Sequence, residues 1–264
     1  NVAFGTLTVL LVALVARRVA GSHAGILATL FLATHGVVVA YFSYESYPAF
    51  AAFSFALCLT IVVMYGHTWP WRLLGALLVG SLFLVRSNLW PAVPLLGLWA
   101  LWRARSNNER LLTVGALLVA PVAFFAWDPS HVKVLAYVPG LRGLAESAGY
   151  VSAFILDDRP TLAPREQAWA VLSLVRRHEF WALAFACLVP GCHRWLRGPV
   201  LGLGALLAGI LGALAYMYPW NARWLGLYVL PYAPLAAILL GLGYADLLAR
   251  RPRLGAALLA ILLI

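Results

Sequence analysis

Three charged side chains stand beside long apolar stretches, where a charge is energetically unfavourable. Glu45 lies between two such stretches and is the only acidic residue among the first 108. Arg86 interrupts another, and Arg223 opens a further one amid four aromatic residues. A charge at the centre of a membrane helix costs about 2.5–3.5 kcal/mol on insertion scales. These three residues are therefore the first candidates for binding or catalysis.

Each candidate has a chemical and a structural interpretation. A guanidinium can hold a phosphate through two parallel hydrogen bonds, which makes Arg86 and Arg223 candidate anion-binding residues. Glu45 is equally consistent with a solvated loop carboxylate. Arg86 is also consistent with a side chain that reaches the lipid headgroups or pairs with a loop acid, and Arg223 with an interfacial aromatic belt. The residue types alone leave these alternatives open.

Other polar residues give weaker signals. His35 lies within an apolar stretch, where a packed, hydrogen-bonded histidine is commoner than a metal ligand. Asp157 and Asp158 could bind a cation, but adjacent loop carboxylates are usually solvated, and His178-Glu179 lacks the second histidine of a zinc helix. The sequence has no Walker loop, no Rossmann glycine fingerprint and no Gly-x-Ser-x-Gly elbow. Nucleotide-driven pumping therefore has no support in this chain.

Composition places these residues in a membrane protein. Of 264 residues, 64% are hydrophobic and 11% are charged, and the mean hydropathy is +0.89. A soluble domain has about 25% charged residues, so most of this chain must avoid water. We predict an all-α, polytopic membrane domain over residues 1–264. The composition argues against disordered, collagenous, disulfide-stapled and soluble enzyme classes, and against nucleic-acid binding despite the net charge of +10.

Short polar segments divide the chain into about ten predicted membrane helices. They cover residues 2–16, 24–42, 48–65, 73–85, 89–102, 111–127, about 181–192, 199–217, 224–246 and 254 onward. The chain starts and stops within apolar stretches, so we expect a fragment in which the first and last helices are truncated. Consecutive helices leave the membrane on alternate sides, so their connections form two sets.

The two sets of connections differ in charge. One set comprises residues 17–23, 66–72, 103–110, 193–198 and 247–253, and it holds 11 of the 19 basic residues. Its only acids are Glu109 and Asp246, which stands at the helix end just before the last of these connections. The positive-inside rule predicts that this set is cytoplasmic. The only long connection, residues 128–180, is then extracytoplasmic. Within it, Pro164 and the apolar spacing that follows predict a helix at the membrane surface over 164–178.

Two predicted spans are too short to cross a bilayer. Residues 73–85 and 89–102 supply 13 and 14 residues, or about 20 Å of helix each, against a hydrocarbon core of about 30 Å. Their connecting turn at 86–88 should therefore lie below the outer surface. Irregular backbone at that depth is stable only where it is buried in protein or lines a wet cavity. We expect an outward-facing cavity at this turn.

Three segments of the chain together resemble a known family. Residues 73–94 (LLGALLVGSLFLVRSNLWPAVP) are similar to the helical hairpin of the integral-membrane GT-C glycosyltransferases, particularly the group of protein O-mannosyltransferases and the lipid A aminoarabinose transferase. Residues 42–48 (FSYESYP) resemble an outer segment of that family, and residues 223–234 resemble its Arg-Tyr-x-Leu-Pro-x-x-Pro helix. Tyr47 departs from the pattern because the family has arginine there. The family's acidic pair is expected upstream of Asn1.

The resemblance implies transfer of a sugar from a polyprenyl-phosphate donor to a protein, lipid or glycan acceptor. The reaction is expected on the extracytoplasmic face of a bacterial plasma membrane, with the connection 128–180 closing over the donor and excluding water. Glu45 is the implied catalytic carboxylate of this chain, which binds a divalent cation (Mg²⁺, Mn²⁺ or Zn²⁺) or orients the acceptor, while the principal general base is expected upstream of Asn1. The implied substrate-binding residues are Tyr44, Tyr47, Arg86, Asn88 and Arg223.

Two other functions fit the same sequence. A polar break at membrane depth is also how secondary transporters build binding sites, so a transporter or lipid flippase is the first alternative. Against it, the two halves of the chain show no internal repeat. The second alternative is a non-catalytic membrane subunit that binds a partner through its long connection.

Overall fold

The computed structural model describes residues 1–44, 46–127, 199–217 and 229–263, and their regular secondary structure is entirely helical. This confirms the all-α class for the described residues. The long connection, the surface helix expected over 164–178 and the predicted span at about 181–192 lie outside these ranges. The number of membrane helices in the whole chain therefore stays a prediction.

The helices of the described residues follow one another closely along the chain. Their order is α1 (Val2–Ala20), α2 (Ser22–Thr34), α3 (Gly36–Tyr44), α4 (Ser46–Thr60), the π-helical η1 (Ile61–Tyr65), α5 (Trp69–Val85), the 3₁₀ turn η2 (Ser87–Leu89), α6 (Ala92–Trp102) and α7 (Asn107–Trp127). After the first long gap come α12 (Pro199–Met217), the 3₁₀ turn η4 (Leu230–Tyr232), α14 (Ala233–Arg250) and α15 (Pro252–Leu263).

Four helical segments of the described residues are long and apolar enough to cross a membrane. They are Val2–Ala20, Pro48–Tyr65, Asn107–Trp127 and Leu230–Arg250. Shorter apolar helices accompany them at Ser22–Thr34, Trp69–Val85, Ala92–Trp102 and Val200–Leu214. By length and composition, these helices are compatible with an integral membrane protein, which the composition of the chain predicts.

The predicted short hairpin is only half confirmed. Helix α6 has 11 residues, or about 16 Å of rise, which is far short of a bilayer core. Helix α5 is longer than expected, with 17 residues, because it begins at Trp69 instead of residue 73. Proline is tolerated in the first helical turn, where the missing N–H has no partner to lose. Pro70 therefore starts this helix and does not delay it.

The predicted single helix over 24–42 is wrong, because the chain breaks at His35. This residue is extended (φ −69°, ψ 106°) and separates α2 from α3. Its Nδ1 accepts a hydrogen bond from the backbone N–H of Val38 at 3.4 Å, which places a side-chain acceptor at the start of α3. The apolar run continues through the break, so hydrophobic periodicity gives no sign of it.

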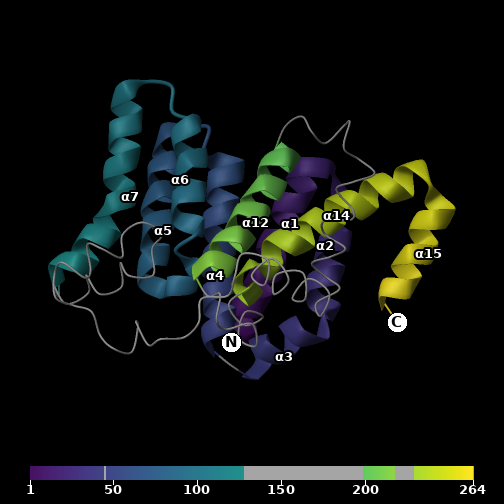
Figure 1. The fold of residues 1–264 in the computed structure, drawn as a ribbon. Helices are drawn as coiled ribbons and strands as arrows, with labels where there is room; N and C mark the ends of the chain where they lie inside the picture. The colour runs from purple at the N-terminus through teal and green to yellow at the C-terminus, as the bar shows by residue number, and fades with distance from the viewer. Residues whose placement is uncertain (45, 128–198, 218–228, 264) are drawn as a thin grey trace.

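The connections between helices gather at two opposite ends of the molecule. The α1–α2, α4–α5, α6–α7 and α14–α15 junctions lie at the upper end in Figure 1, and the N-terminus, α3 and the α5–α6 turn lie at the lower end. We call the upper end the arginine-rich end, after Arg17, Arg18, Arg72, Arg103, Arg105, Arg110, Arg250, Arg251 and Arg253. We call the lower end the hairpin end, after residues 86–91. The described connections that the sequence groups together thus share one end.

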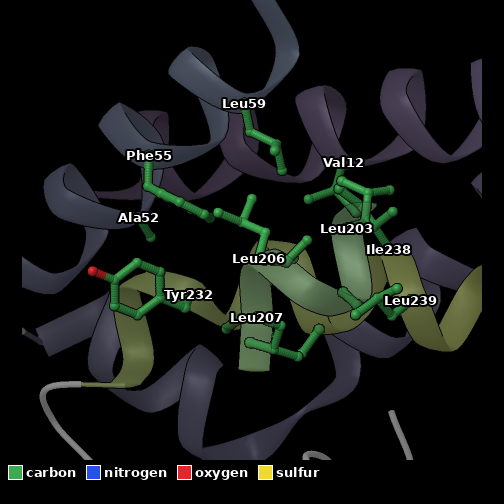
Figure 2. Packing of buried hydrophobic residues seen from close by; sticks show 14 of the residues in the cluster. Val12, Ala52, Phe55, Leu59, Leu203, Leu206, Leu207, Tyr232, Ile238 and Leu239 are labelled. Atoms are coloured by element: carbon green, nitrogen blue, oxygen red, sulfur yellow. The ribbon is translucent and has the colours of Figure 1, made fainter. Parts of the chain in front are cut away.

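Helix α14 forms the centre of the described bundle. Every residue from Ala233 to Tyr244 is buried, and the helix packs against α1, α2, α4 and α12. Figure 2 shows Ile238 and Leu239 of this helix in the same buried cluster as Val12 of α1 and Leu203 of α12. The closest approach is at Gly241, where a Cβ atom would stand 2.5 Å from the carbonyl oxygen of Ala24. Small residues of this kind let membrane helices pack closely without a hydrophobic driving force between them.

Helix α7 lies at the edge of the bundle, on the opposite side from α15 (Figure 1). It packs mainly on α5, where a Cβ atom on Gly80 would overlap the carbonyl oxygen of Leu117. Only 6% of the residues in its apolar 18-residue stretch are buried. Leucine and valine side chains therefore cover the outer surface of α7. This surface is suited to lipid contact.

Candidate functional site

The turn between α5 and α6 places Arg86 at the hairpin end. Arg86 is extended (φ −171°, ψ 152°) and ends α5, and its carbonyl accepts a hydrogen bond from the backbone N–H of Leu89 at 3.0 Å. Trp90 closes the turn from the other side. Its Nε1 donates to the carbonyl of Phe83 at 3.0 Å, and the two rings stack with centroids 4.5 Å apart. The turn is therefore held on both sides of Arg86.

A tyrosine from a distant part of the chain fixes the same turn to the bundle. The hydroxyl of Tyr232 in η4 donates to the carbonyl oxygen of Asn88 at 2.5 Å. Asn88 and Tyr232 are both fully buried, and the Tyr232 ring meets Phe55 of α4 edge-on with centroids 4.8 Å apart. The hairpin turn, α4 and the start of α14 thus form one rigid unit.

Arg86 is the only charged side chain that the described residues place at the hairpin end. The described ranges contain 12 charged side chains, and the other 11 lie at the arginine-rich end. Arg86 is exposed, whereas its neighbours Asn88, Leu89 and Trp90 are buried. It stands about 21 Å along α5 from Arg72, at 1.5 Å per residue. An exposed guanidinium on a rigid apolar support is suited to binding an anion.

The other predicted site residues are described only in part. Glu45 and Arg223 lie outside the described residues, so their convergence with Arg86 stays a prediction. The backbones of Tyr44 and Tyr47 are described, at the end of α3 and in the first turn of α4. Asn88 is the one whose surroundings are best defined, and it lies within protein.

The expected wet cavity at the α5–α6 turn stays a prediction, because the two cavities defined by the described residues lie elsewhere. One apolar cavity of about 290 Å³ lies between α1, α2 and α3, and another of about 300 Å³ lies between α6 and α12. Neither is lined by residues of the α5–α6 turn. Of the two environments that stabilise irregular backbone at membrane depth, burial in protein is the one that Asn88 and Leu89 have.

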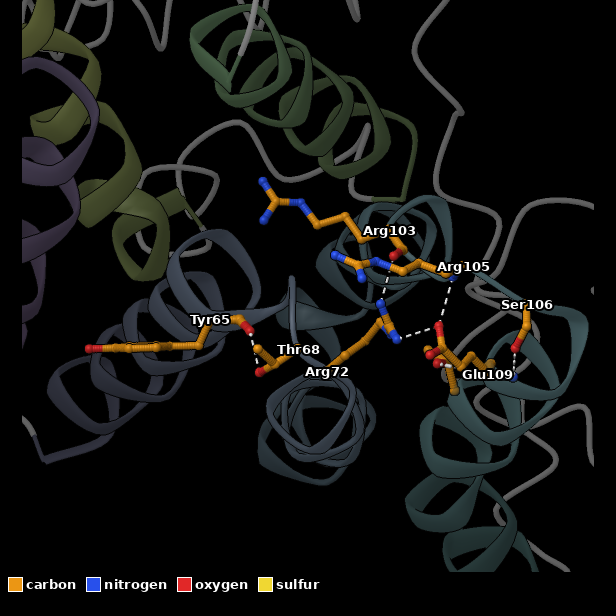
Figure 3. A network of polar contacts seen from close by, with 8 residues as sticks. Tyr65, Thr68, Arg72, Arg103, Arg105, Ser106 and Glu109 are labelled. Atoms are coloured by element: carbon orange, nitrogen blue, oxygen red, sulfur yellow. Dashed lines mark hydrogen bonds and ion pairs between the residues drawn. The ribbon is translucent and has the colours of Figure 1, made fainter.

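A polar network ties three helices together at the arginine-rich end (Figure 3). Arg72 of α5 is 2% exposed, and its Nη2 pairs with Glu109 Oε2 of α7 at 2.6 Å. Its Nη1 donates to the carbonyl of Arg103, at the end of α6, at 2.6 Å. The guanidinium therefore has both a counter-charge and a backbone acceptor, which a buried arginine needs.

The same network starts helix α7. Glu109 Oε2 also accepts a hydrogen bond from the backbone N–H of Arg105 at 2.7 Å, and the Glu109 N–H donates to Ser106 Oγ at 3.2 Å. Ser106-x-x-Glu109 is the capping-box spacing that satisfies the first N–H groups of a helix. Arg103 Nη1 reaches the carbonyl of Val63 at 3.2 Å, and partial burial lowers the pKa of this guanidinium, which stays protonated at physiological pH.

Sequence reasoning counted these arginines and missed their pairing. From the sequence, Arg72, Arg103 and Arg105 indicated only which connections are cytoplasmic. In the structure, Arg72 of α5 also bonds to Arg103 and Glu109, which lie 31 and 37 positions further along the chain. The capping-box spacing of Ser106 and Glu109 is the signal that could have marked Glu109 as a structural carboxylate. Glu109 is also the only acidic residue within the sequence of the arginine-rich connections, which points the same way.

No metal centre is found in the described part of the chain. Those residues contain no group of three or more histidine, cysteine, aspartate or glutamate side chains that could hold an ion, and Glu45, the predicted ligand, lies outside them. Comparison with protein-family models, with curated proteins and with solved structures found no match to this chain.

Proposed function

We propose that this protein transfers a sugar from a polyprenyl-phosphate donor to an acceptor at the hairpin end, with Arg86 binding the donor phosphate. The observation that carries the proposal is the contrast between Arg86 and its support. The exposed guanidinium stands beside three buried residues, Asn88, Leu89 and Trp90, on a turn that is fixed by Trp90 and Tyr232. The resemblance of residues 73–94 to the glycosyltransferase hairpin supplies the substrate class.

Arg86 has two tasks in the proposed reaction. It binds the phosphate diester of the donor in the ground state, through N–H groups that match two phosphate oxygens. As the bond between the anomeric carbon and the phosphate oxygen breaks, its electron pair goes to the leaving lipid phosphate. A cation fixed beside that oxygen stabilises the added charge, and a rigid support keeps it there without reorganisation.

The acceptor side of the reaction rests on carboxylates. The acceptor hydroxyl attacks the anomeric carbon and loses its proton, which calls for a carboxylate base within hydrogen-bond reach. Glu45 is our candidate to orient that hydroxyl, with the principal base upstream of Asn1. Arg223 is a second candidate for the phosphate. Both assignments come from the resemblance, and both predict side chains near Arg86.

The experiment is a transfer assay on full-length protein reconstituted in liposomes. The donors are polyprenyl-phosphate mannose and polyprenyl-phosphate aminoarabinose, and the readout is release of polyprenyl phosphate. We expect Arg86→Ala to lower turnover about 100-fold, the scale seen when one charge-stabilising donor is removed. Arg86→Lys should recover part of that loss, because lysine keeps the charge and loses the paired geometry.

The matched control is Arg253→Ala, which removes an exposed arginine at the arginine-rich end. It should leave turnover within about twofold of the unmodified protein, since surface charges far from a site have small effects. Near-normal transfer by Arg86→Ala would remove Arg86 from the site. Transbilayer movement of the intact donor without sugar release would favour the flippase alternative.

A further inference from the structure

Four aromatic side chains join the end of α7 to the turn that carries Arg86. Phe83 of α5 stacks on Trp90 with ring centroids 4.5 Å apart, and it meets Phe124 and Phe125 of α7 at 5.3 and 5.7 Å. Phe124 and Phe125 also contact each other at 5.4 Å. We call these four residues the aromatic cluster. Since Arg86 lies between Phe83 and Trp90 in the chain, the cluster includes a residue on each side of the turn.

Two contacts make Trp90 depend on Phe83. The two rings are parallel to within 9°, and Trp90 Nε1 donates a hydrogen bond to the carbonyl of Phe83 at 3.0 Å. Trp90 is buried, so the polar end of its ring has its acceptor within the protein. A displacement of Phe83 would therefore displace Trp90 and, with it, the turn between them.

Helix α7 is fixed along α5 at two further levels (Figure 1). At the arginine-rich end, Arg72 pairs with Glu109 at 2.6 Å. Further along the two helices, Gly80 packs against the carbonyl oxygen of Leu117, which a Cβ atom would overlap. Both pairs are 37 positions apart in the chain, so the two helices keep one register over this length. Helix α7 thus reaches the aromatic cluster as a fixed part of the bundle.

Pro121 accounts for the carbonyl that faces Gly80. Proline has no N–H, so the carbonyl of Leu117, four residues earlier, loses its normal helical donor. That carbonyl lies against Gly80, where a Cα–H group is a weak donor. Helical side chains lean toward the N-terminus of their helix, so Phe124 and Phe125 lean back over the turn that contains the proline. The local sequence of α7 therefore favours both of its contacts with the end of α5.

We propose that the end of α7 positions Arg86, with Phe124 and Phe125 acting through Phe83 and Trp90. The two phenylalanines are positioning residues, since their ring contacts reach the turn through Phe83. A cation that is held in place stabilises developing charge without reorganisation. The expected effect on sugar transfer rests on the proposed function, whereas the expected effect on the turn is independent of it.

Electron paramagnetic resonance tests the support of the turn without a catalytic readout. A nitroxide is attached through Arg86→Cys in the full-length protein, with the native cysteines replaced by alanine, and the protein is reconstituted in liposomes. Because Arg86 is exposed, the label replaces no packed side chain. We expect a spectrum of restricted motion. The double variant Phe124→Leu/Phe125→Leu should shift this spectrum toward faster motion.

The matched control is Phe50→Leu/Phe53→Leu in α4. These two rings contact Phe4 with centroids 5.2 and 5.4 Å apart, so the control also removes two rings from one phenylalanine, outside the aromatic cluster. It should leave the spectrum unchanged. Phe124→Tyr/Phe125→Tyr keeps the rings of α7 and should keep the restricted motion. Equal mobility of the label in the two leucine variants would overturn the inference.

The transfer assay then separates positioning from a general loss of structure. Phe124→Leu/Phe125→Leu should lower turnover about tenfold, less than the roughly 100-fold cost of a 1 Å displacement of a reacting group. In the Arg86→Ala background the same pair should cause no further loss, because its effect acts through Arg86. An equal further loss in that background would overturn the positioning role. Normal transfer by Arg86→Ala would instead refute the proposed function, and the spectra would still decide whether α7 supports the turn.

Discussion

Two arginines at opposite ends of the described bundle have opposite surroundings. At the arginine-rich end, Arg72 is buried and held by Glu109 and by a backbone carbonyl of α6. At the hairpin end, Arg86 is exposed while the turn beneath it is buried and hydrogen-bonded. Protein encloses the guanidinium of Arg72, whereas the guanidinium of Arg86 lies at the surface. The two arginines therefore differ in their accessibility to solvent.

This difference predicts that the two arginines contribute differently to stability. A buried ion pair is costly to break because one uncompensated charge remains in a poorly solvated place. An exposed charge contributes little to stability, even where it is paired. Substitutions at the two ends should therefore change different measurements, and the following predictions start with the largest expected effect on stability.

Breaking the pair at the arginine-rich end should have the largest effect. Arg72→Met leaves the carboxylate of Glu109, whose side chain is 27% exposed, without its counter-charge. We expect a loss of about 3 kcal/mol, measured as a lower midpoint of thermal unfolding in detergent. The double variant Arg72→Met/Glu109→Leu should recover much of this loss. A single variant as stable as the unmodified protein would show that the network is peripheral.

A substitution away from both ends tests whether close packing matters as much as charge. Gly80→Ala brings a Cβ atom against the Leu117 carbonyl, where backbone must shift. Overpacking of this kind costs about 1–3 kcal/mol. The matched control is Gly115→Ala on α7, where a Cβ atom meets nothing within 4 Å. Equal unfolding midpoints for the two variants would contradict the packing of α5 on α7.

The link between the hairpin turn and the bundle should have a smaller effect. Tyr232→Phe keeps the ring packed on Phe55 and removes the donor to the Asn88 carbonyl. We expect a loss of about 1–1.5 kcal/mol, the contribution of one hydrogen bond. Tyr65→Phe, at a tyrosine that is 40% exposed, is the control. Because the turn would loosen, we also expect the rate of the proposed sugar transfer to fall.

The smallest expected effect is that of Arg86→Ala on stability. Since the side chain is exposed, the free energy of unfolding should change by no more than about 0.5 kcal/mol. The unfolding midpoint in detergent is the measurement. A loss comparable to that of Arg72→Met would mean that Arg86 is a structural residue, and the contrast between the two ends would fail.

The sequence predicted the fold class and the alternation of the helices because both depend on summed properties. Hydrophobicity averaged over 15–20 residues marks the helices, and the excess of arginine marks one set of connections. Both signals survive errors at single positions. The ends of helices depend on single residues, so α5 starts four residues earlier than expected. The break at His35 likewise has no counterpart in the hydrophobic pattern.

The site was less accessible to sequence reasoning because it depends on contacts between distant residues. Nothing in the local sequence of Arg72 indicates its pairing with Glu109, 37 positions later. Likewise, Tyr232 and Asn88 are 144 positions apart. Arg86 was identified because an arginine within an apolar stretch is unusual by itself. Only the structure shows that its neighbours Asn88, Leu89 and Trp90 are buried. Their burial indicates that Arg86 stands on a rigid support and not on a loose loop.

The central place of α14 has a consequence for biosynthesis. The helix that α1, α2 and α4 surround leaves the ribosome well after all three of them, since α4 ends at Thr60 and α14 begins at Ala233. At about 5–20 residues per second, those three helices wait roughly 10–35 s in the bilayer before the surface they share is covered. Nascent chains that stop before residue 230 have no centre, and their open helix faces distinguish them from finished molecules for membrane quality control.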